Sequence, residues 1–113
     1  MQPESPALIW DARRAAGRVL EFVADRNWDD YQQDVMLRSA VERQFQIIGE
    51  ALNRLRKVDP DTAGRVPELA RIVAFRNVLV HGYAQIDDAL VWEVASTRVP
   101  ALSDVLAGLL DDP

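Results

Sequence analysis

The sequence contains no cysteine and a single histidine, His81, among its 113 residues. The absence of cysteine excludes disulfides and cysteine-ligated metal sites. One histidine without a nearby carboxylate cluster falls short of the three or four ligands of a usual zinc site. Glycine is also scarce, and Gly49 and Gly64 stand alone, so no glycine-rich phosphate loop is present. We therefore expect a function that needs neither a metal nor another cofactor.

The chain also lacks long hydrophobic runs and a basic excess. No apolar run approaches the about 20 residues that a membrane span needs, and the first six residues do not resemble a signal peptide. These absences predict a cytoplasmic protein without a membrane segment. The formal net charge is −5, whereas nucleic-acid binders usually carry positive charge that neutralises phosphates. Any RNA contact must therefore come from a local basic patch or from two chains that pool their charges.

What the sequence does have is the composition of one globular domain, which we expect to span residues 1–113. Apolar residues make up 49% and charged residues 27%, too hydrophobic a mixture for disorder. Apolar residues recur at helical spacing, and no segment shows the alternation of a strand. The pattern predicts an all-α protein.

Two helices are expected in the first half of the chain. Ser5 and Pro6 form an N-cap followed by proline at the first helical position, and this helix continues to about Arg26. Asp30 is the expected N-cap of a long second helix that ends near Lys57. The apolar stripe of the second helix comprises Val41, Phe45 or Ile48, Leu52 and Leu55.

The second half predicts two more helices after a loop over residues 59–64. Pro67 is expected to begin the third helix, which ends near Gly82 because glycine is common just beyond a helix. Asp87 caps the fourth helix, and Pro100 should kink it or split it in two. An up-and-down four-helix bundle is the simplest arrangement of these helices.

The third predicted helix is apolar around most of its circumference, which is typical of a buried helix. It nevertheless carries Arg76, Asn77 and His81, and burying such groups without partners is costly. We therefore expect these polar residues to line a groove, and we expect a homodimer with the third helix at or near its interface.

The run from Arg76 to Tyr83 is the predicted functional centre. On an ideal helix Asn77 and His81 lie about 40° apart, and Arg76 and Tyr83 lie about 20° apart if the helix continues that far. Two polar stripes then run along one apolar helix. A structural alternative remains for His81, because a histidine near a helix end can cap the last carbonyls and favour the helix dipole.

The pattern Arg76-Asn77-x3-His81-Gly82-Tyr83 resembles the Arg-x4-His-x-Tyr motif of the HepT-like toxins, a family of the all-helical HEPN superfamily. The segments Gln46-Ile47-Ile48-Gly49-Glu50-Ala51 and Ile86-Asp87, followed by Val91-Trp92, are also similar to that family. The resemblance extends over nearly the whole chain.

The resemblance implies a metal-independent endoribonuclease toxin of a type II/VII-like toxin–antitoxin system. It implies that His81 is the general base or acid at the ribose 2′-OH, that Arg76 holds the scissile phosphate, and that Asn77 orients phosphate or histidine. It further implies that Tyr83 accepts AMP from a partner nucleotidyltransferase antitoxin, which silences the toxin. The chemistry is reasonable, because RNA carries its own nucleophile and histidine titrates near neutral pH.

Phosphoryl transfer benefits from both a base and an acid, but one chain supplies one histidine. A two-fold dimer would bring a second His81 and Arg76 to the same cleft. Two alternatives remain open: a non-catalytic helical binding subunit of a nucleotidyltransferase complex, and an oligomeric scaffold in which His81 is structural. Tyr83 also has a structural alternative, in which it is an interfacial aromatic residue with a satisfied hydroxyl. The tryptophans are interpreted as core, staple or interface residues rather than base-stacking platforms: Trp10, Trp28 and Trp92.

Overall fold

The computed structural model describes residues 1–82 and 85–111. Within these ranges the chain is all-α and contains no strand, as the sequence predicts. The helices are α1 (Ser5–Val23), α2 (Trp28–Gln33), α3 (Val35–Val58), α4 (Pro60–Ala63), α5 (Leu69–His81), α6 (Asp88–Thr97) and α7 (Val99–Asp111).

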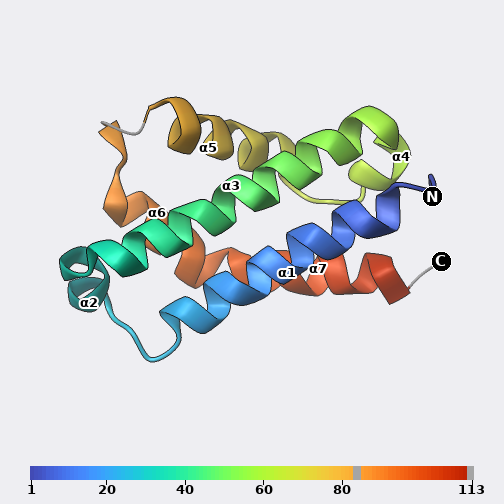
Figure 1. Cartoon of the computed structure of the whole chain (residues 1–113). Helices are drawn as coiled ribbons and strands as arrows, with labels where there is room; N and C mark the ends of the chain where they lie inside the picture. The colour runs from blue at the N-terminus through green and yellow to red at the C-terminus, as the bar shows by residue number, and fades with distance from the viewer. Residues whose placement is uncertain (83–84, 112–113) are drawn as a thin grey trace.

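The bundle is built around the two longest helices, α1 and α3, which pack side by side (Figure 1). Helix α7 packs on α1, and α5 packs on α3 at the opposite edge. The predicted four-helix bundle is therefore confirmed, with α2 and α4 as short additions and with α6 and α7 in place of one last helix. None of the helices in the described ranges is long and apolar enough to cross a membrane.

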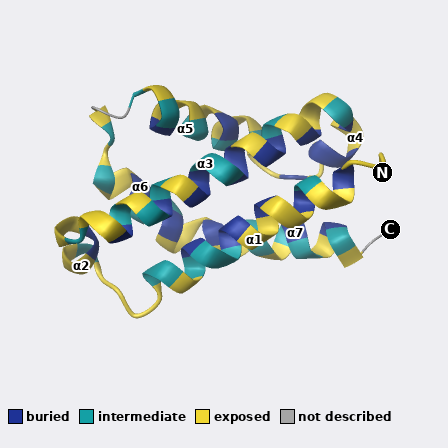
Figure 2. Ribbon diagram, in the orientation of Figure 1, coloured by how far each residue is buried: buried dark blue, intermediate teal, exposed yellow. Residues whose placement is uncertain are grey.

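The core lies between α1, α3 and the tandem pair α6–α7, where the buried faces of these helices meet (Figure 2). The predicted stripe of α3 is buried, and its members are joined by residues of α1, α6 and α7, among them Ile9, Val19, Val91 and Leu106. Helix α5 contributes much less to the core, since only Val73 and Leu79 of that helix are buried. Most of the apolar side chains of α5 are therefore not fully buried within one chain.

The tryptophans occupy two kinds of environment. Trp28 and Trp92 flank the buried Tyr31, with ring centroids 6.2 Å and 5.3 Å from the tyrosine ring, so they join α2 to α6. Trp10 instead lies half exposed on α1, where the Arg14 guanidinium carbon is 5.2 Å from its ring centroid. A core role is therefore wrong for Trp10.

Ser5 is not the N-cap of the first helix. Glu4 occupies the cap position and makes no side-chain cap bond, while Ser5 is already helical and buried. The Ser5 hydroxyl donates a 2.7 Å hydrogen bond to Asp59 Oδ2. The hydroxyl therefore bonds to a carboxylate 54 residues away in the sequence instead of capping the helix. Local sequence rules do not detect such a partner.

Asp30 is likewise not an N-cap. Asn27 caps α2 by accepting from the Asp30 backbone N–H at 2.8 Å, and Asp30 Oδ2 accepts from the Asn27 N–H at 3.1 Å. This reciprocal capping box begins a short helix before the predicted start. The long helix α3 then begins after Asp34, whose side chain accepts from Leu37 N–H at 3.0 Å.

The segment after α3 is more ordered than the predicted loop, because α4 forms within it. Asp59 caps α4 through a 3.2 Å bond from the Thr62 N–H, and Pro60 occupies an early helical position where a missing N–H costs nothing. Helix α5 begins at Leu69 rather than Pro67, since Glu68 adopts a left-handed backbone with φ of 59°.

Three other helix ends agree with the sequence. Helix α5 ends at His81, with Gly82 at the C-cap. Asp87 caps α6 by accepting from the Ala89 and Leu90 N–H groups at 3.0 Å and 3.2 Å. The last helix is split at Arg98, so that Pro100 lies in the first turn of α7, where proline is tolerated.

Candidate functional site

The site begins where α5 crosses α3 at Gly49. A Cβ atom at Gly49 would lie 2.2 Å from Arg76 Cβ and 2.6 Å from Arg76 Cγ. No side chain fits at those distances, and Arg76 Cβ cannot move away unless the α5 backbone also moves. Glycine at position 49 therefore allows the two helices to approach closely and holds the Arg76 stem against α3. Nearby, Phe45 of α3 and Phe75 of α5 pack edge to face, with their ring centroids 5.2 Å apart.

The Arg76 guanidinium is held by its neighbour along the chain. Arg76 Nη1 donates a 3.0 Å hydrogen bond to Asn77 Oδ1. Arg76 Nε is buried and has no hydrogen-bond partner within residues 1–82 and 85–111. Since buried donors are nearly always paired, this atom lacks a hydrogen bond that most such donors make. The structure thus brings Arg76 and Asn77 together, as expected for a phosphate-binding pair.

His81 occupies a different side of α5. It is the last residue of the helix, and its side chain is exposed. Five residues separate it from Arg76, which corresponds to about 140° around the helix axis. The imidazole makes no hydrogen bond in the described part of the chain, so the predicted alternative of capping the last carbonyls is not what the structure contains. A single chain does not aim His81 and Arg76 at one point.

Tyr83, the proposed acceptor of AMP, lies outside the described residues.

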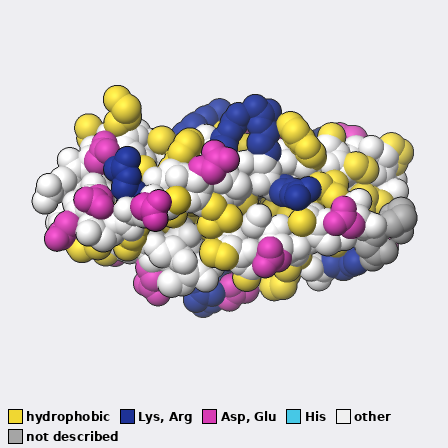
Figure 3. All heavy atoms as spheres, turned by 90° about the horizontal axis from the view of Figure 1, so that it is seen from below, with side chains coloured by type: hydrophobic (Ala, Val, Ile, Leu, Met, Phe, Trp, Pro, Cys, Tyr) yellow, Lys and Arg dark blue, Asp and Glu magenta, His cyan; other side chains and the backbone are white. Residues whose placement is uncertain are grey.

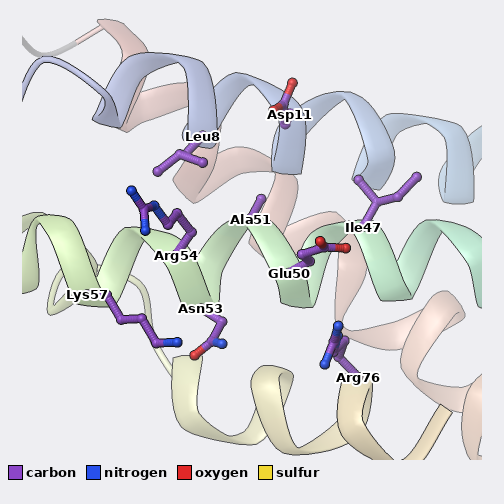
Figure 4. A pocket seen from close by; sticks show the side chains of 9 residues that line it. All are labelled: Leu8, Asp11, Ile47, Glu50, Ala51, Asn53, Arg54, Lys57 and Arg76. Carbon is purple, nitrogen blue, oxygen red and sulfur yellow. The ribbon is translucent and has the colours of Figure 1, made fainter. Parts of the chain in front are cut away.

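A groove opens beside Arg76, with α3 as its floor and α1 and α5 at its sides (Figure 4). We call it the Arg76 groove; its volume is about 510 Å³. Figure 4 shows the Asn53 and Lys57 side chains on the α5 side of α3, while Arg54 points toward α1. The groove is lined by Leu8, Asp11, Ile47, Glu50, Ala51, Asn53, Arg54, Lys57 and Arg76.

The Arg76 groove carries a local excess of basic residues in an acidic protein. Three cationic residues face two carboxylates, whereas the whole chain has a net charge of −5. In Figure 3, basic side chains also gather along the upper edge of the molecule, whereas most acidic side chains on this face are scattered singly. From the sequence we expected RNA contact through a local basic patch or through two chains, but we did not predict the α3 residues of this groove as RNA contacts. The helical spacing of Glu50, Arg54 and Lys57 indicates one shared face, but not which helix borders it.

The acidic residues do not assemble into a metal site. Within the described ranges, no group of three or more histidine, cysteine, aspartate or glutamate residues lies close enough together to hold a metal ion.

Comparison with known proteins identifies the family. Residues 12–109 match the family described as Ribonuclease HepT-like. The chain belongs to the HepT-like ribonuclease family. The family membership indicates an RNase of the HEPN type. The matched range includes Arg76, Asn77 and His81, so the resemblance from the short motif extends to most of the chain.

Individual relatives agree with the family. The chain is similar to "Putative RNase MJ1380" of Methanocaldococcus jannaschii, with 33% identity over 98 residues that cover 85% of this chain and 87% of the relative. It is also similar to "Probable ribonuclease HepT" of Thermococcus cleftensis, with 29% identity over 96 residues, which cover 81% and 83% of the two chains. A search of solved structures finds no match.

Proposed function

We propose that this HepT-like ribonuclease cleaves RNA internally without a metal ion, with Arg76, Asn77 and His81 as its reactive groups. The observation that carries the proposal is the arginine held over Gly49, its guanidinium bonded to Asn77 and its Nε left unpaired within the described residues. Arg76 donates to the non-bridging oxygens of the scissile phosphate and stabilises the charge that develops there. Asn77 fixes the orientation of the guanidinium.

His81 acts on the protons of the reaction. The ribose 2′-OH loses a proton as it attacks the phosphorus, and the departing 5′ oxygen gains one as its bond to phosphorus breaks. Imidazole exchanges protons readily near neutral pH. The products are a 2′,3′-cyclic phosphate and a 5′-hydroxyl.

A homodimer reconciles this chemistry with the geometry. Since His81 and Arg76 diverge by about 140° on one helix, the imidazole that acts beside one Arg76 comes from the second chain. An apolar groove of about 410 Å³ between α5 and the α6–α7 pair supports this arrangement. We call it the apolar groove, and its lining includes Phe45, Ile72, Phe75, Leu90, Val94 and Leu102. Covering this surface with a second chain removes apolar area from water.

Cleavage of labelled RNA in the presence of EDTA tests the reaction. We expect the wild type to remain active in EDTA, and we expect His81→Ala to reduce the rate by at least about a hundredfold. Gln85→Ala, an exposed change near the same helix end, serves as the matched control and should retain activity. Equal rates for His81→Ala and wild type would refute the assignment.

We further propose that the ribonuclease acts in the cytoplasm as the toxin of a toxin–antitoxin pair, silenced when a nucleotidyltransferase antitoxin adds AMP to Tyr83. A phosphate and nucleoside two residues beyond His81 would crowd the site and compete for Arg76. Incubation with the partner and ATP, followed by intact-mass measurement, should give AMP additions on the wild type and none on Tyr83→Phe. Equal mass gains in both proteins would contradict Tyr83 as the acceptor.

A growth assay separates this function from that of a non-catalytic binding subunit. Expression of the wild type should arrest growth, and His81→Ala should abolish the arrest while the protein remains folded by circular dichroism. Arrest by both proteins would favour a role that does not depend on cleavage.

A further inference from the structure

We propose that the Arg76 groove is a subsite for the RNA nucleotide next to the cleaved bond, in which Lys57 contacts a flanking phosphate and Asn53 contacts the base. This inference rests on the proposed function. It names Lys57 and Asn53 as RNA-binding residues outside the Arg-x4-His-x-Tyr motif, and it gives the RNA strand a direction across the protein, from Arg76 along α3 toward α4.

The size and position of the groove suit a nucleotide. Its volume of about 510 Å³ falls within the range of small-molecule binding sites. Arg76 lines the groove toward one end (Figure 4), so a nucleotide in the groove would lie next to a phosphate held by the guanidinium. The floor, α3, is a long regular helix and therefore a rigid support for binding side chains.

Two buried polar atoms between α3 and α5 have no hydrogen-bond partner in the described part of the chain. One is Asn53 Oδ1 on α3, and the other is Arg76 Nε on α5. Both residues line the same groove. A buried acceptor and a buried donor are costly when unpaired, and a nucleotide offers complements to both. Its base N–H or amino group can donate to Asn53, and its phosphate oxygens can accept from Arg76.

Lys57 is placed for a second phosphate. It lies eight residues beyond Gly49, where Arg76 crosses α3, which corresponds to about 12 Å along the helix. Its ammonium group makes no ion pair within residues 1–82 and 85–111. Arg54, another cationic residue of the groove, forms an ion pair in which its Nη2 lies 3.2 Å from Glu4 Oε1. Lys57 is therefore the cation of this groove with the least internal competition.

Glu50 and Asp11 limit where phosphate can lie. Glu50 is on α3 and Asp11 is on α1 (Figure 4). Glu50 follows Gly49 and lies toward the Arg76 end of the groove, where its carboxylate disfavours a second phosphate and can accept hydrogen bonds from the amino groups of bases. Lys57 lies toward the other end, beyond Asn53, so the flanking phosphate is placed at Lys57 and the base beside Asn53.

The test compares two adjacent basic residues of α3. Lys57→Gln removes a groove cation, while Arg56→Gln removes an exposed cation that does not line the groove. Binding of a fluorescent single-stranded RNA, 2′-O-methylated so that it is not cleaved, is measured by anisotropy at several salt concentrations. We expect Lys57→Gln to raise Kd about threefold to tenfold and to reduce the salt slope by about 0.7, the value for one lost phosphate contact on a single strand. Arg56→Gln should leave both quantities unchanged.

Asn53→Leu tests the base contact with a side chain of similar volume. We expect Kd for the same RNA to rise about fivefold with no change in the salt slope, because an uncharged contact has been lost. Circular dichroism and thermal unfolding confirm that each variant remains folded. Equal losses in Lys57→Gln and Arg56→Gln, unchanged binding in both, or no binding by the wild type would each overturn the subsite.

Parallel cleavage assays separate the subsite from the proposed function. If His81→Ala is inactive while Lys57→Gln and Asn53→Leu bind and cleave like the wild type, the reactive residues stand and the subsite is wrong. If His81→Ala cleaves normally but Lys57→Gln loses binding, the subsite stands and the role of His81 is wrong.

Discussion

Asp59 is the residue that ties the beginning of the chain to the end of α3. Its Oδ2 accepts hydrogen bonds from the Gln2 N–H at 2.9 Å, from the Ser5 hydroxyl at 2.7 Å and from the Thr62 hydroxyl at 2.7 Å. The Gln2 amide bond lowers the pKa of the carboxyl most, followed by the Thr62 and Ser5 hydroxyls, so the group stays ionised well below its usual range. Each of these donors favours the charged form.

This arrangement predicts how stability depends on pH. A carboxyl whose pKa is depressed on folding stabilises the native state above its unfolded pKa of about 3.9, and the contribution declines as pH falls below that value. We expect Asp59→Asn to lower the thermal midpoint by several degrees at pH 7, and the difference from wild type to shrink toward pH 3. Thermal unfolding from pH 3 to pH 7 measures this. A difference that stays constant over the range would contradict the assignment.

At the scale of helices, the decisive contact is the crossing of α3 and α5 at Gly49. The same crossing positions Arg76, which lines the Arg76 groove, so the packing and the proposed function both depend on the absence of a side chain at Gly49. Gly17 of α1 offers a natural comparison, because a Cβ atom added there meets nothing within 4 Å.

We expect Gly49→Ala to destabilise the fold by about 1–3 kcal/mol, as overpacking does, and to reduce RNA cleavage by displacing Arg76. Gly17→Ala should instead stabilise the protein by about 0.5–1 kcal/mol, because alanine is the better helix former, with cleavage unchanged. Urea unfolding and RNA cleavage assays on both variants provide the measurements. A Gly49→Ala protein with wild-type stability and activity would show that the crossing tolerates a methyl group.

Helices are also the scale at which the sequence was most informative. Long apolar stripes predict α1, α3 and α5 because helical spacing is a local property, and Asp87 and Pro100 mark the ends of the last two helices for the same reason. The errors at Ser5 and Asp30 arise from competing partners, one distant and one three residues away. Asn53 and Lys57 were not predicted as site residues, because the groove exists only once α1 and α5 lie beside α3.

At the scale of the whole molecule, the apolar groove leaves hydrophobic side chains uncovered in one chain. Leu90 lines it and is 46% exposed, whereas Met36, on α3 and outside this groove, is 79% exposed. Apolar exposure alone therefore does not identify the interface, and the concave surface between α5 and α6–α7 is the better candidate.

The proposed dimer is tested by introducing a charge into that groove. We expect Leu90→Glu to convert a dimer into a monomer at micromolar concentration and to lower cleavage with it, because a carboxylate is costly to bury. Met36→Glu should leave the dimer and its activity intact. Light scattering and sedimentation give the masses. A monomeric wild type, or a Leu90→Glu variant that remains dimeric, would contradict this interface.

The start of α1 at Ser5 and the end of α7 at Asp111 lie at the same end of the molecule, and α5 ends with His81 at the other (Figure 1). The longest dimension of the molecule is 42 Å. A linker attached after α7 can therefore anchor the protein to a bead or sensor surface with His81 directed away from the support, which makes the molecule well suited to single-molecule observation of RNA cleavage.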